Sequence, residues 1–115
     1  MRLKSGIWVA AYLRRCQVEG LVAVLRRRGS EEAGAIFIKV SRLDGSAGLF
    51  GPAPASLGAK DAERRWQPCL ASLPAAEAEA DRYLAQQLAF DPDLWIIVVE
   101  DRQGRHFLDD WLAPV

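Results

Sequence analysis

A basic run, Arg26-Arg27-Arg28, forms the densest group of functional side chains in the sequence. Guanidinium groups bind phosphates and carboxylates through paired, charge-assisted hydrogen bonds. If the strand that ends in this run lies beside the end of the first predicted helix, its arginines join others in one anion-binding patch. The alternative is a solvated strand end whose arginines pair with Glu31, Glu32 or the carboxylates at the hairpin ends. The residues predicted for the patch are Arg14, Arg15, Arg26, Arg27, Arg28 and Arg42.

A second group consists of the single histidine, His106, and the carboxylates around the longest apolar run. Asp91 and Asp93 precede this run, and Glu100 and Asp101 follow it. Such groups could serve as a general acid/base pair or hold a divalent metal. However, a strand rises about 3.3 Å per residue, so Asp91 and Asp101 would lie near opposite ends of a strand roughly 20 Å long. We therefore interpret the carboxylates first as turn residues and His106 as an ordinary strand-end residue.

The sequence contains none of the short motifs that mark nucleophilic or nucleotide-dependent catalysis. There is no nucleophile elbow, no GxGxxG run and no GK[ST]. Cys16 and Cys69 are far apart and form no CxxC pair, which favours two reduced thiols. One histidine does not favour a dedicated transition-metal site. We therefore predict no catalytic residue, no metal and no cofactor.

The composition is that of one globular domain, assigned to residues 1–115. Fifteen basic and fifteen acidic residues give a formal net charge of zero. This balance argues against bulk attraction to nucleic acid or to an anionic membrane, and it mildly favours self-association. The N-terminal segment resembles neither a signal peptide nor a membrane span, which predicts a cytoplasmic protein. Four tryptophans either share one core or mark an interface: Trp8, Trp66, Trp95 and Trp111.

The elements that must position these groups are organised around the apolar run 94–100. It is rich in β-branched residues and predicts a strand buried on both faces, in the middle of a sheet. A helix is predicted from Ser5, as its cap, to about Glu19, with Gly20 as its stop. A strand over residues 7–13 is the alternative, because these residue types also suit strands. The apolar stripe of the helix consists of Trp8, Val9, Tyr12, Leu13 and Cys16.

The middle of the chain predicts further strands. The segment 21–27 begins apolar on both faces, whereas 35–42 alternates between an aliphatic and a mixed face. Asp44-Gly45 is the strongest hairpin signal and should join 35–42 to a short strand at about 47–50. The residue composition then predicts a surface loop at 51–61. A fourth strand is predicted within 64–72, where Pro68 marks an edge or a bulge.

A second helix is predicted to open at Leu73-Pro74 and to end at Phe90-Asp91-Pro92-Asp93. Its acidic first turns suit the helix dipole, and its apolar stripe is Ala76, Ala80, Tyr83, Leu84 and Leu88. A hairpin loop at 101–105, a short strand at 106–108 and a tail that docks through Trp111 and Leu112 should follow. The fold class is therefore α+β: a mostly antiparallel sheet of five or six strands with two amphipathic helices packed on one face.

Several segments of the sequence together carry a family resemblance that covers nearly the whole chain. They are residues 7–15 (IWVAAYLRR), 39–45 (KVSRLDG), 49–54 (LFGPAP), 77–84 (EAEADRYL), 90–95 (FDPDLW), 100–102 (EDR) and 104–107 (GRHF). As a set they resemble a small bacterial family catalogued as domain of unknown function 1491. The resemblance implies one short stand-alone domain in a bacterial cytoplasm, and it carries over no functional residue.

Three functional hypotheses follow from the sequence. The first is a small non-catalytic binding or regulatory module that associates with itself or with a protein partner through an exposed apolar patch. The second is an anion or nucleic-acid binder that uses the arginine patch, with binding that weakens steeply in salt. The third is a small metal-assisted hydrolase, which requires Asp91, Asp93, Glu100 or Asp101 to meet His106 within hydrogen-bond reach.

Overall fold

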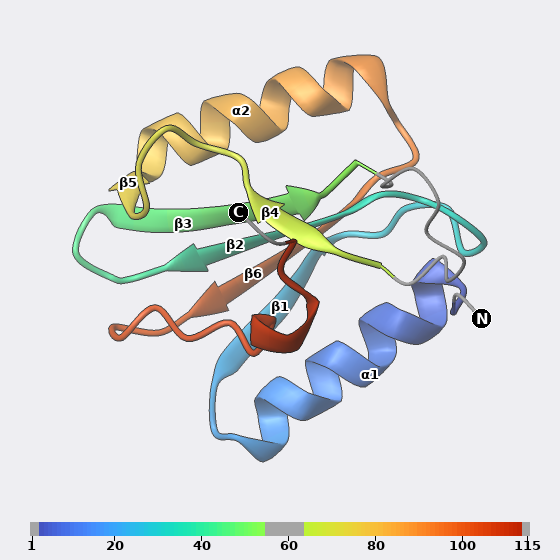
Figure 1. Ribbon diagram of the computed structural model, residues 1–115, viewed down its shortest axis with the longest axis horizontal. Helices are drawn as coiled ribbons and strands as arrows, with labels where there is room; N and C mark the ends of the chain where they lie inside the picture. The colour runs from blue at the N-terminus through green and yellow to red at the C-terminus, as the bar shows by residue number, and fades with distance from the viewer. Residues whose placement is uncertain (1–2, 55–63, 114–115) are drawn as a thin grey trace.

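The structure, a computed structural model, describes residues 3–54 and 64–113, and it is an α+β fold of two helices and one open six-stranded sheet (Figure 1). A single 3-10 turn, η1, follows near the C-terminus. The elements are α1 (Ser5–Val18), β1 (Val22–Arg27), β2 (Ile36–Ser41), β3 (Ser46–Pro52), β4 (Trp66–Pro68), β5 (Ala75–Ala76), α2 (Glu77–Phe90), β6 (Trp95–Glu100) and η1 (Asp109–Trp111).

The strand predicted at 94–100 is β6, and it lies inside the sheet as expected. The strand order is β1-β6-β2-β3-β4, with β5 paired to β3 at one side of this path. β6 is antiparallel to β1 and parallel to β2, whereas the other pairings are antiparallel. Every residue of β2 is buried, and so are four of the six in β6. The β-branched run therefore occupies the interior, where both of its faces find apolar neighbours.

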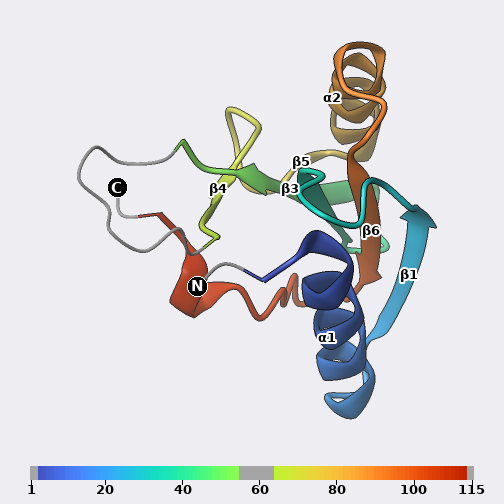
Figure 2. The same cartoon turned by 90° about the vertical axis from the view of Figure 1, so that its right-hand side faces the viewer.

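The two helices cover opposite faces of the sheet, so the prediction that both pack on one face is wrong (Figure 2). Successive side chains of a strand point to opposite faces. Ile36 and Ile38 of β2 pack with α1, whereas Phe37, between them, packs with α2. A sheet whose inner strands are apolar on both faces needs a cover on each side.

Helix α1 ends at Val18, with Glu19 as its C-cap, close to the predicted end at about Glu19. Gly20 follows with a φ of +79°, the left-handed conformation that suits glycine after a helix. Trp8, Val9, Tyr12 and Cys16 are buried as the stripe predicts, and the alternative strand at 7–13 does not form. Ser5, however, is not the cap, because Lys4 holds that position. The Ser5 hydroxyl instead donates a 2.6 Å hydrogen bond to the Gly34 carbonyl, in a buried position.

Helix α2 starts at Glu77, later than the predicted opening at Leu73-Pro74. Residues 75–76 form β5 first, and the Glu77 N–H then donates to the Gly45 carbonyl in the β2–β3 turn. The helix ends at Phe90, ahead of Pro92, as predicted. The hairpin contact places the acidic first turn of α2 directly beside the end of β2.

Three predictions about the strands need correction or limits. β1, predicted as a strand that begins apolar on both faces, is an edge strand in which the apolar Val22 and Val24 are 57% and 52% exposed. Residues 106–108 form no strand. Within the predicted loop 51–61, Gly51 and Pro52 belong to β3, and residues 55–61 lie outside the described part of the chain.

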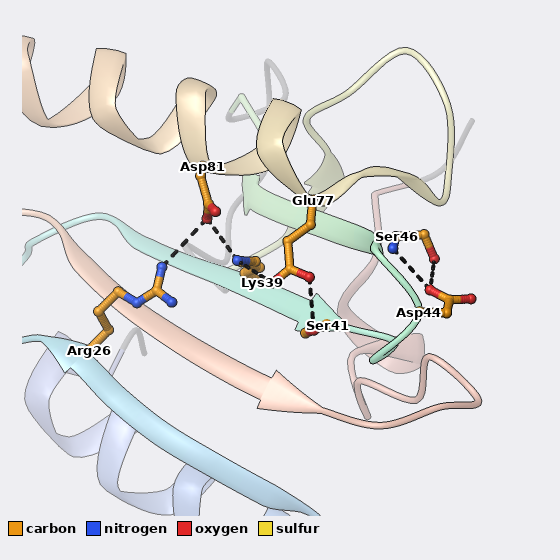
Figure 3. A network of polar contacts seen from close by, with 7 residues as sticks. All are labelled: Arg26, Lys39, Ser41, Asp44, Ser46, Glu77 and Asp81. Atoms are coloured by element: carbon orange, nitrogen blue, oxygen red, sulfur yellow. Dashed lines mark hydrogen bonds and ion pairs between the residues drawn. The ribbon is translucent and has the colours of Figure 1, made fainter.

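Lys39 is the one charged side chain at the centre of β2, and it is only 1% exposed. Its ammonium donates to Asp81 at 2.7 Å and contacts Glu77 at 2.9 Å, both on α2 (Figure 3). Ser41 donates to Glu77 at 3.3 Å, and Arg26 contacts Asp81 at 3.6 Å. A buried ammonium requires such counter-charges, so this network fixes how α2 sits on the sheet.

We expect the double variant E77Q/D81N to lower the free energy of unfolding by about 3 kcal/mol, because the buried ammonium loses its counter-charges. K39M should lower the free energy of unfolding clearly less, because the carboxylates of Glu77 and Asp81 are partly exposed and can be solvated by water. Urea denaturation followed by tryptophan fluorescence measures both, with E79Q on the same helix turn as the control. A K39M variant less stable than E77Q/D81N would contradict this account.

Candidate functional site

An apolar groove of ≈ 250 Å³ lies between α1 and the C-terminal segment. Helix α1 contributes the nearly buried Trp8 and Tyr12 together with Arg15, whereas Phe107 and Trp111 come from the other end of the chain. The C-terminal segment is held beside α1, near β4, where Leu112 forms a bridge with Trp66 (Figure 1). The residues that line this groove, named the aromatic groove below, are Leu3, Trp8, Ala11, Tyr12, Arg15, Phe107 and Trp111.

Three rings of the aromatic groove, those of Trp8, Tyr12 and Trp111, form one connected set. Trp8 stacks on Tyr12 with ring centres 5.0 Å apart and meets Trp111 edge to face at 6.2 Å. Beneath them, Trp66 lies 4.4 Å from Trp8 and is fully buried. Aromatic pairs in these geometries stabilise each other beyond simple burial, so Trp8 and Tyr12 form a rigid base of the groove. Trp111 forms a partly exposed wall.

Phe107 is held in an unusual backbone conformation at the rim of the aromatic groove. Its φ is +56°, in the left-handed region that residues other than glycine seldom occupy. The Arg15 guanidinium lies over its ring at 5.1 Å, a cation–π contact. One residue earlier, the His106 carbonyl accepts a 2.7 Å hydrogen bond from the Tyr12 hydroxyl. Burial raises the pKa of Tyr12, so its hydroxyl keeps the proton that makes this bond.

The six predicted anion-binding arginines do not meet in one place. Arg14 and Arg15 lie exposed on α1, and Arg15 contacts Glu19 at 3.7 Å. Arg26 reaches Asp81 on the α2 face of the sheet. The remaining three each have a local partner: Arg27 donates to the Pro92 carbonyl, Arg28 pairs with Glu31 and lies over Trp95, and Arg42 donates to the Gln103 carbonyl. Anion binding by these residues as a set stays a prediction.

The carboxylates proposed for a hydrolase also lie apart. Asp91 precedes β6 and accepts the N–H of Asp93 in a turn, as the composition of that segment predicts. Glu100 and Asp101 lie at the other end of the same strand, nearer to His106 in sequence. Within residues 3–54 and 64–113, no three His, Cys, Asp or Glu side chains are grouped so that they could hold a metal ion.

Asp101 is buried and organises the turn that leads into the C-terminal segment. Its carboxylate accepts from the Arg105 N–H at 2.7 Å and from the Arg105 side chain at 2.9 Å. Its own N–H donates to the Ser41 carbonyl, which ties the turn to the end of β2. The hydrogen bonds from Arg105 hold the pKa of Asp101 below its ordinary value. The turn therefore fixes where His106 and Phe107 begin their path across the molecule.

The sequence pointed to only part of the aromatic groove. The surplus of tryptophan marked Trp8 and Trp111 as candidates for an interface, while Tyr12 was recognised only as part of the apolar stripe. Phe107 was interpreted as a strand residue, because its left-handed conformation has no signal in the local sequence. That conformation depends on the Asp101 turn and on the contact with α1.

The fold defines the chain as a small α+β domain with one helix on each face of an open sheet. It belongs to the family described as proteins of unknown function, DUF1491, whose model matches residues 3–109. No curated protein is detectably similar to it in sequence. None of the helices in the described ranges has the length and apolarity needed to cross a membrane.

Solved structures of similar proteins share this fold. The crystal structure of a DUF1491 family protein from Caulobacter crescentus CB15 has a TM-score of 0.81 and 37% sequence identity, and the match covers 99% of this chain and 100% of that one. An NMR structure of a DUF1491 family protein from the same strain has a TM-score of 0.80 and 38% sequence identity, and the match covers 99% of each chain. A solution structure of a protein from A. tumefaciens has a TM-score of 0.74 and 38% sequence identity, and the match covers 87% of this chain and 86% of that chain.

We expect the stability contribution of Asp101 to depend on pH in one direction. Because its folded pKa is lowered, the contribution is complete above the ordinary carboxyl pKa of about 4 and is lost as the pH falls through the folded value. The difference in free energy of unfolding between the wild type and D101N should therefore be constant at neutral pH and shrink below about pH 4. Urea denaturation at a series of pH values measures it. D109N, on the exposed η1 turn, is the control. A difference that grows on acidification would contradict the lowered pKa.

Proposed function

We propose that the protein is a non-catalytic binding module that holds a short, extended peptide segment of a partner protein in the aromatic groove. The observation that carries this proposal is the meeting of four aromatic side chains, from α1 and from the C-terminal segment, around one apolar hollow with a single arginine at its rim. The segment bound would present a proline or aliphatic side chain followed by an acidic residue.

The shape and chemistry of the rings support an extended segment as the occupant. Flat aromatic faces suit the pyrrolidine ring of proline and branched aliphatic side chains, as in other domains that recognise proline-rich peptides. Phe107 and Trp111 are partly exposed, so a ligand can reach them. The unusual φ of Phe107 also supports a binding role, because strained residues are often kept where a site needs them.

Arg15 supports the choice of an acidic neighbour on the bound segment. Its side chain is 52% exposed, and its contact with Glu19 spans 3.7 Å at the surface. An exposed pair of this kind contributes little to stability. A carboxylate of the partner can therefore take the place of Glu19 at small cost, with the guanidinium still stacked on Phe107.

The cellular setting fits an intracellular partner. Cys16 and Cys69 are both free thiols, as in proteins of a reducing compartment. We therefore extend the proposal to a cytoplasmic binding module.

The separation of Asp91 from Asp101 and His106 along β6 supports the non-catalytic part of the proposal.

The outer edge of β1 favours self-association as a second candidate function. Val22 and Val24 are half exposed, and the strand has no neighbour on its outer side among the described residues. A bulge between Leu25 and Arg27 limits the usable edge to the first four residues. If a second copy pairs antiparallel with this edge so that Val24 lies opposite its own counterpart, Arg26 of one copy lies opposite Val22 of the other. Arg26 then approaches Glu100 of that copy, because Glu100 is the cross-strand neighbour of Val22. The charges then match.

We expect proline-rich peptides that carry one glutamate to bind the wild-type protein and to change its tryptophan fluorescence. W111A should weaken this binding at least about tenfold, because it removes an exposed aromatic wall of the groove. R15E should reverse the preference, so that matched peptides with lysine in place of glutamate bind better. R82E, an exposed charge reversal on α2, is the control. Equal binding of the glutamate and lysine peptides to the wild type, or no effect of W111A, would contradict the proposal.

For the second candidate, we expect sedimentation equilibrium at about 100 μM to show a mass above one chain. R26E and E100R should each lower the apparent association constant, because each places like charges together across the paired edges. The double variant R26E/E100R should restore it, whereas R82E should leave it unchanged. A wild-type protein that remains a monomer, or a double variant weaker than both single variants, would rule out this edge as the interface.

A further inference from the structure

A second, smaller cavity of ≈ 170 Å³ lies where the β2–β3 hairpin meets the Asp101 turn. Its volume equals roughly five or six water molecules at about 30 Å³ each. Most of its wall is apolar or backbone, and two side chains bring hydrogen-bond donors, Arg42 and His106. The lining residues of this cavity, named the Arg42 pocket below, are Val40, Arg42, Gly48, Phe50, Leu73, Pro74, Gly104 and His106.

Arg42 is held in position by the turn that follows β6. Its Nη2 donates to the Gln103 carbonyl at 3.1 Å. Gly104 has a φ of +74°, which favours glycine in the turn, and a Cβ there would lie 2.9 Å from the Arg42 Nε, so a larger residue would displace the guanidinium. With one donor used in this contact, the planar guanidinium keeps further donors for a carboxylate, whose geometry it matches.

His106 supplies the second donor of the Arg42 pocket. Its Nδ1 accepts the Leu108 N–H at 2.9 Å, so a neutral ring carries its proton on Nε2. Nε2 makes no hydrogen bond to any residue in the described ranges. The ring packs 4.6 Å from Phe50 and is half buried, and this burial lowers the pKa of His106. The imidazole is therefore a neutral donor near pH 7, and it lines the same pocket as the permanent positive charge of Arg42.

We propose that the Arg42 pocket binds a short aliphatic carboxylate, with its carboxylate on Arg42 and His106 and its hydrocarbon part against Phe50, Val40 and Leu73. A carboxylate matches the planar guanidinium and leaves its hydrocarbon part to fill the apolar wall, whereas a phosphate would bring a larger charge and no hydrocarbon. This site is independent of the aromatic groove, because the two share no lining residue.

The test uses butyrate as the probe and follows the amide signals of the 15N-labelled full chain. For a ligand of this size we expect a dissociation constant of about 1 mM, with saturable shifts at Gly48 and Gly104. Butyramide has the same shape without the charge, and inorganic phosphate has charge without the chain. Butyramide should bind at least about tenfold more weakly than butyrate, because it lacks the charge that strengthens the hydrogen bond to Arg42. Phosphate should also bind at least about tenfold more weakly, because it has no hydrocarbon chain to bury against the apolar wall.

Matched variants locate the binding. R42Q should weaken butyrate binding at least about tenfold, whereas R102Q, on the same turn but exposed, should leave it unchanged. H106N keeps an acceptor for the Leu108 N–H but loses the donor at Nε2, so it should bind more weakly than H106Q, which keeps a donor at that reach. Amide spectra of every variant report whether the fold is retained.

Three results would overturn the proposal. The first is no saturable shift at about 20 mM butyrate, where a millimolar site is nearly filled. The second is butyramide or phosphate binding as tightly as butyrate, which would show that the pocket does not select a carboxylate. The third is unchanged binding in a folded R42Q variant, which would place the ligand elsewhere. Each of these results leaves the aromatic groove and its peptide untouched, so failure here is distinguishable from failure of the proposed function.

Discussion

The arrangement of this domain depends on the most deeply buried charge among the described residues, the ammonium of Lys39. It lies at the centre of β2, on the sheet face that α2 covers, where an unpaired charge would cost several kcal/mol. Helix α2 compensates it with two carboxylates one turn apart, Glu77 and Asp81. Because Glu77 is also tied to the β2–β3 turn through its N–H, the rotation and the position of α2 are fixed together.

The opposite face is closed mainly by aromatic rings. Trp8 and Tyr12 pack against Trp66, and the C-terminal segment crosses beside them. That segment has little regular structure of its own, so its path depends on a few anchors: the Asp101 carboxylate, the Tyr12 hydroxyl and the ring of Trp111. Residues 106 and 107 lie between the aromatic groove and the Arg42 pocket and line one each.

Much of the fold could be predicted from residue pattern, and most of the candidate site could not. The run 94–100 is long, apolar and β-branched, so its interior place follows from the sequence, as do both helices and the Asp44-Gly45 hairpin. The faces covered by the helices did not follow, because an apolar stripe shows that a helix packs without showing on which side. Lys39 seemed to mark a mixed face of its strand, yet its partners lie about forty residues away in sequence.

The sequence by itself determined the class of fold, the interior strand and the family to which the chain belongs, because these depend on local periodicity and on patterns within short segments. Only the tertiary structure decided that the arginines are dispersed, that Phe107 meets Arg15, and that Arg42 and His106 share a cavity. Each of these facts depends on where distant segments of the chain lie relative to one another. The last two depend on the irregular turn that follows β6. The path of such a turn is set by the buried hydrogen bonds of Asp101 and by packing, which no local pattern records.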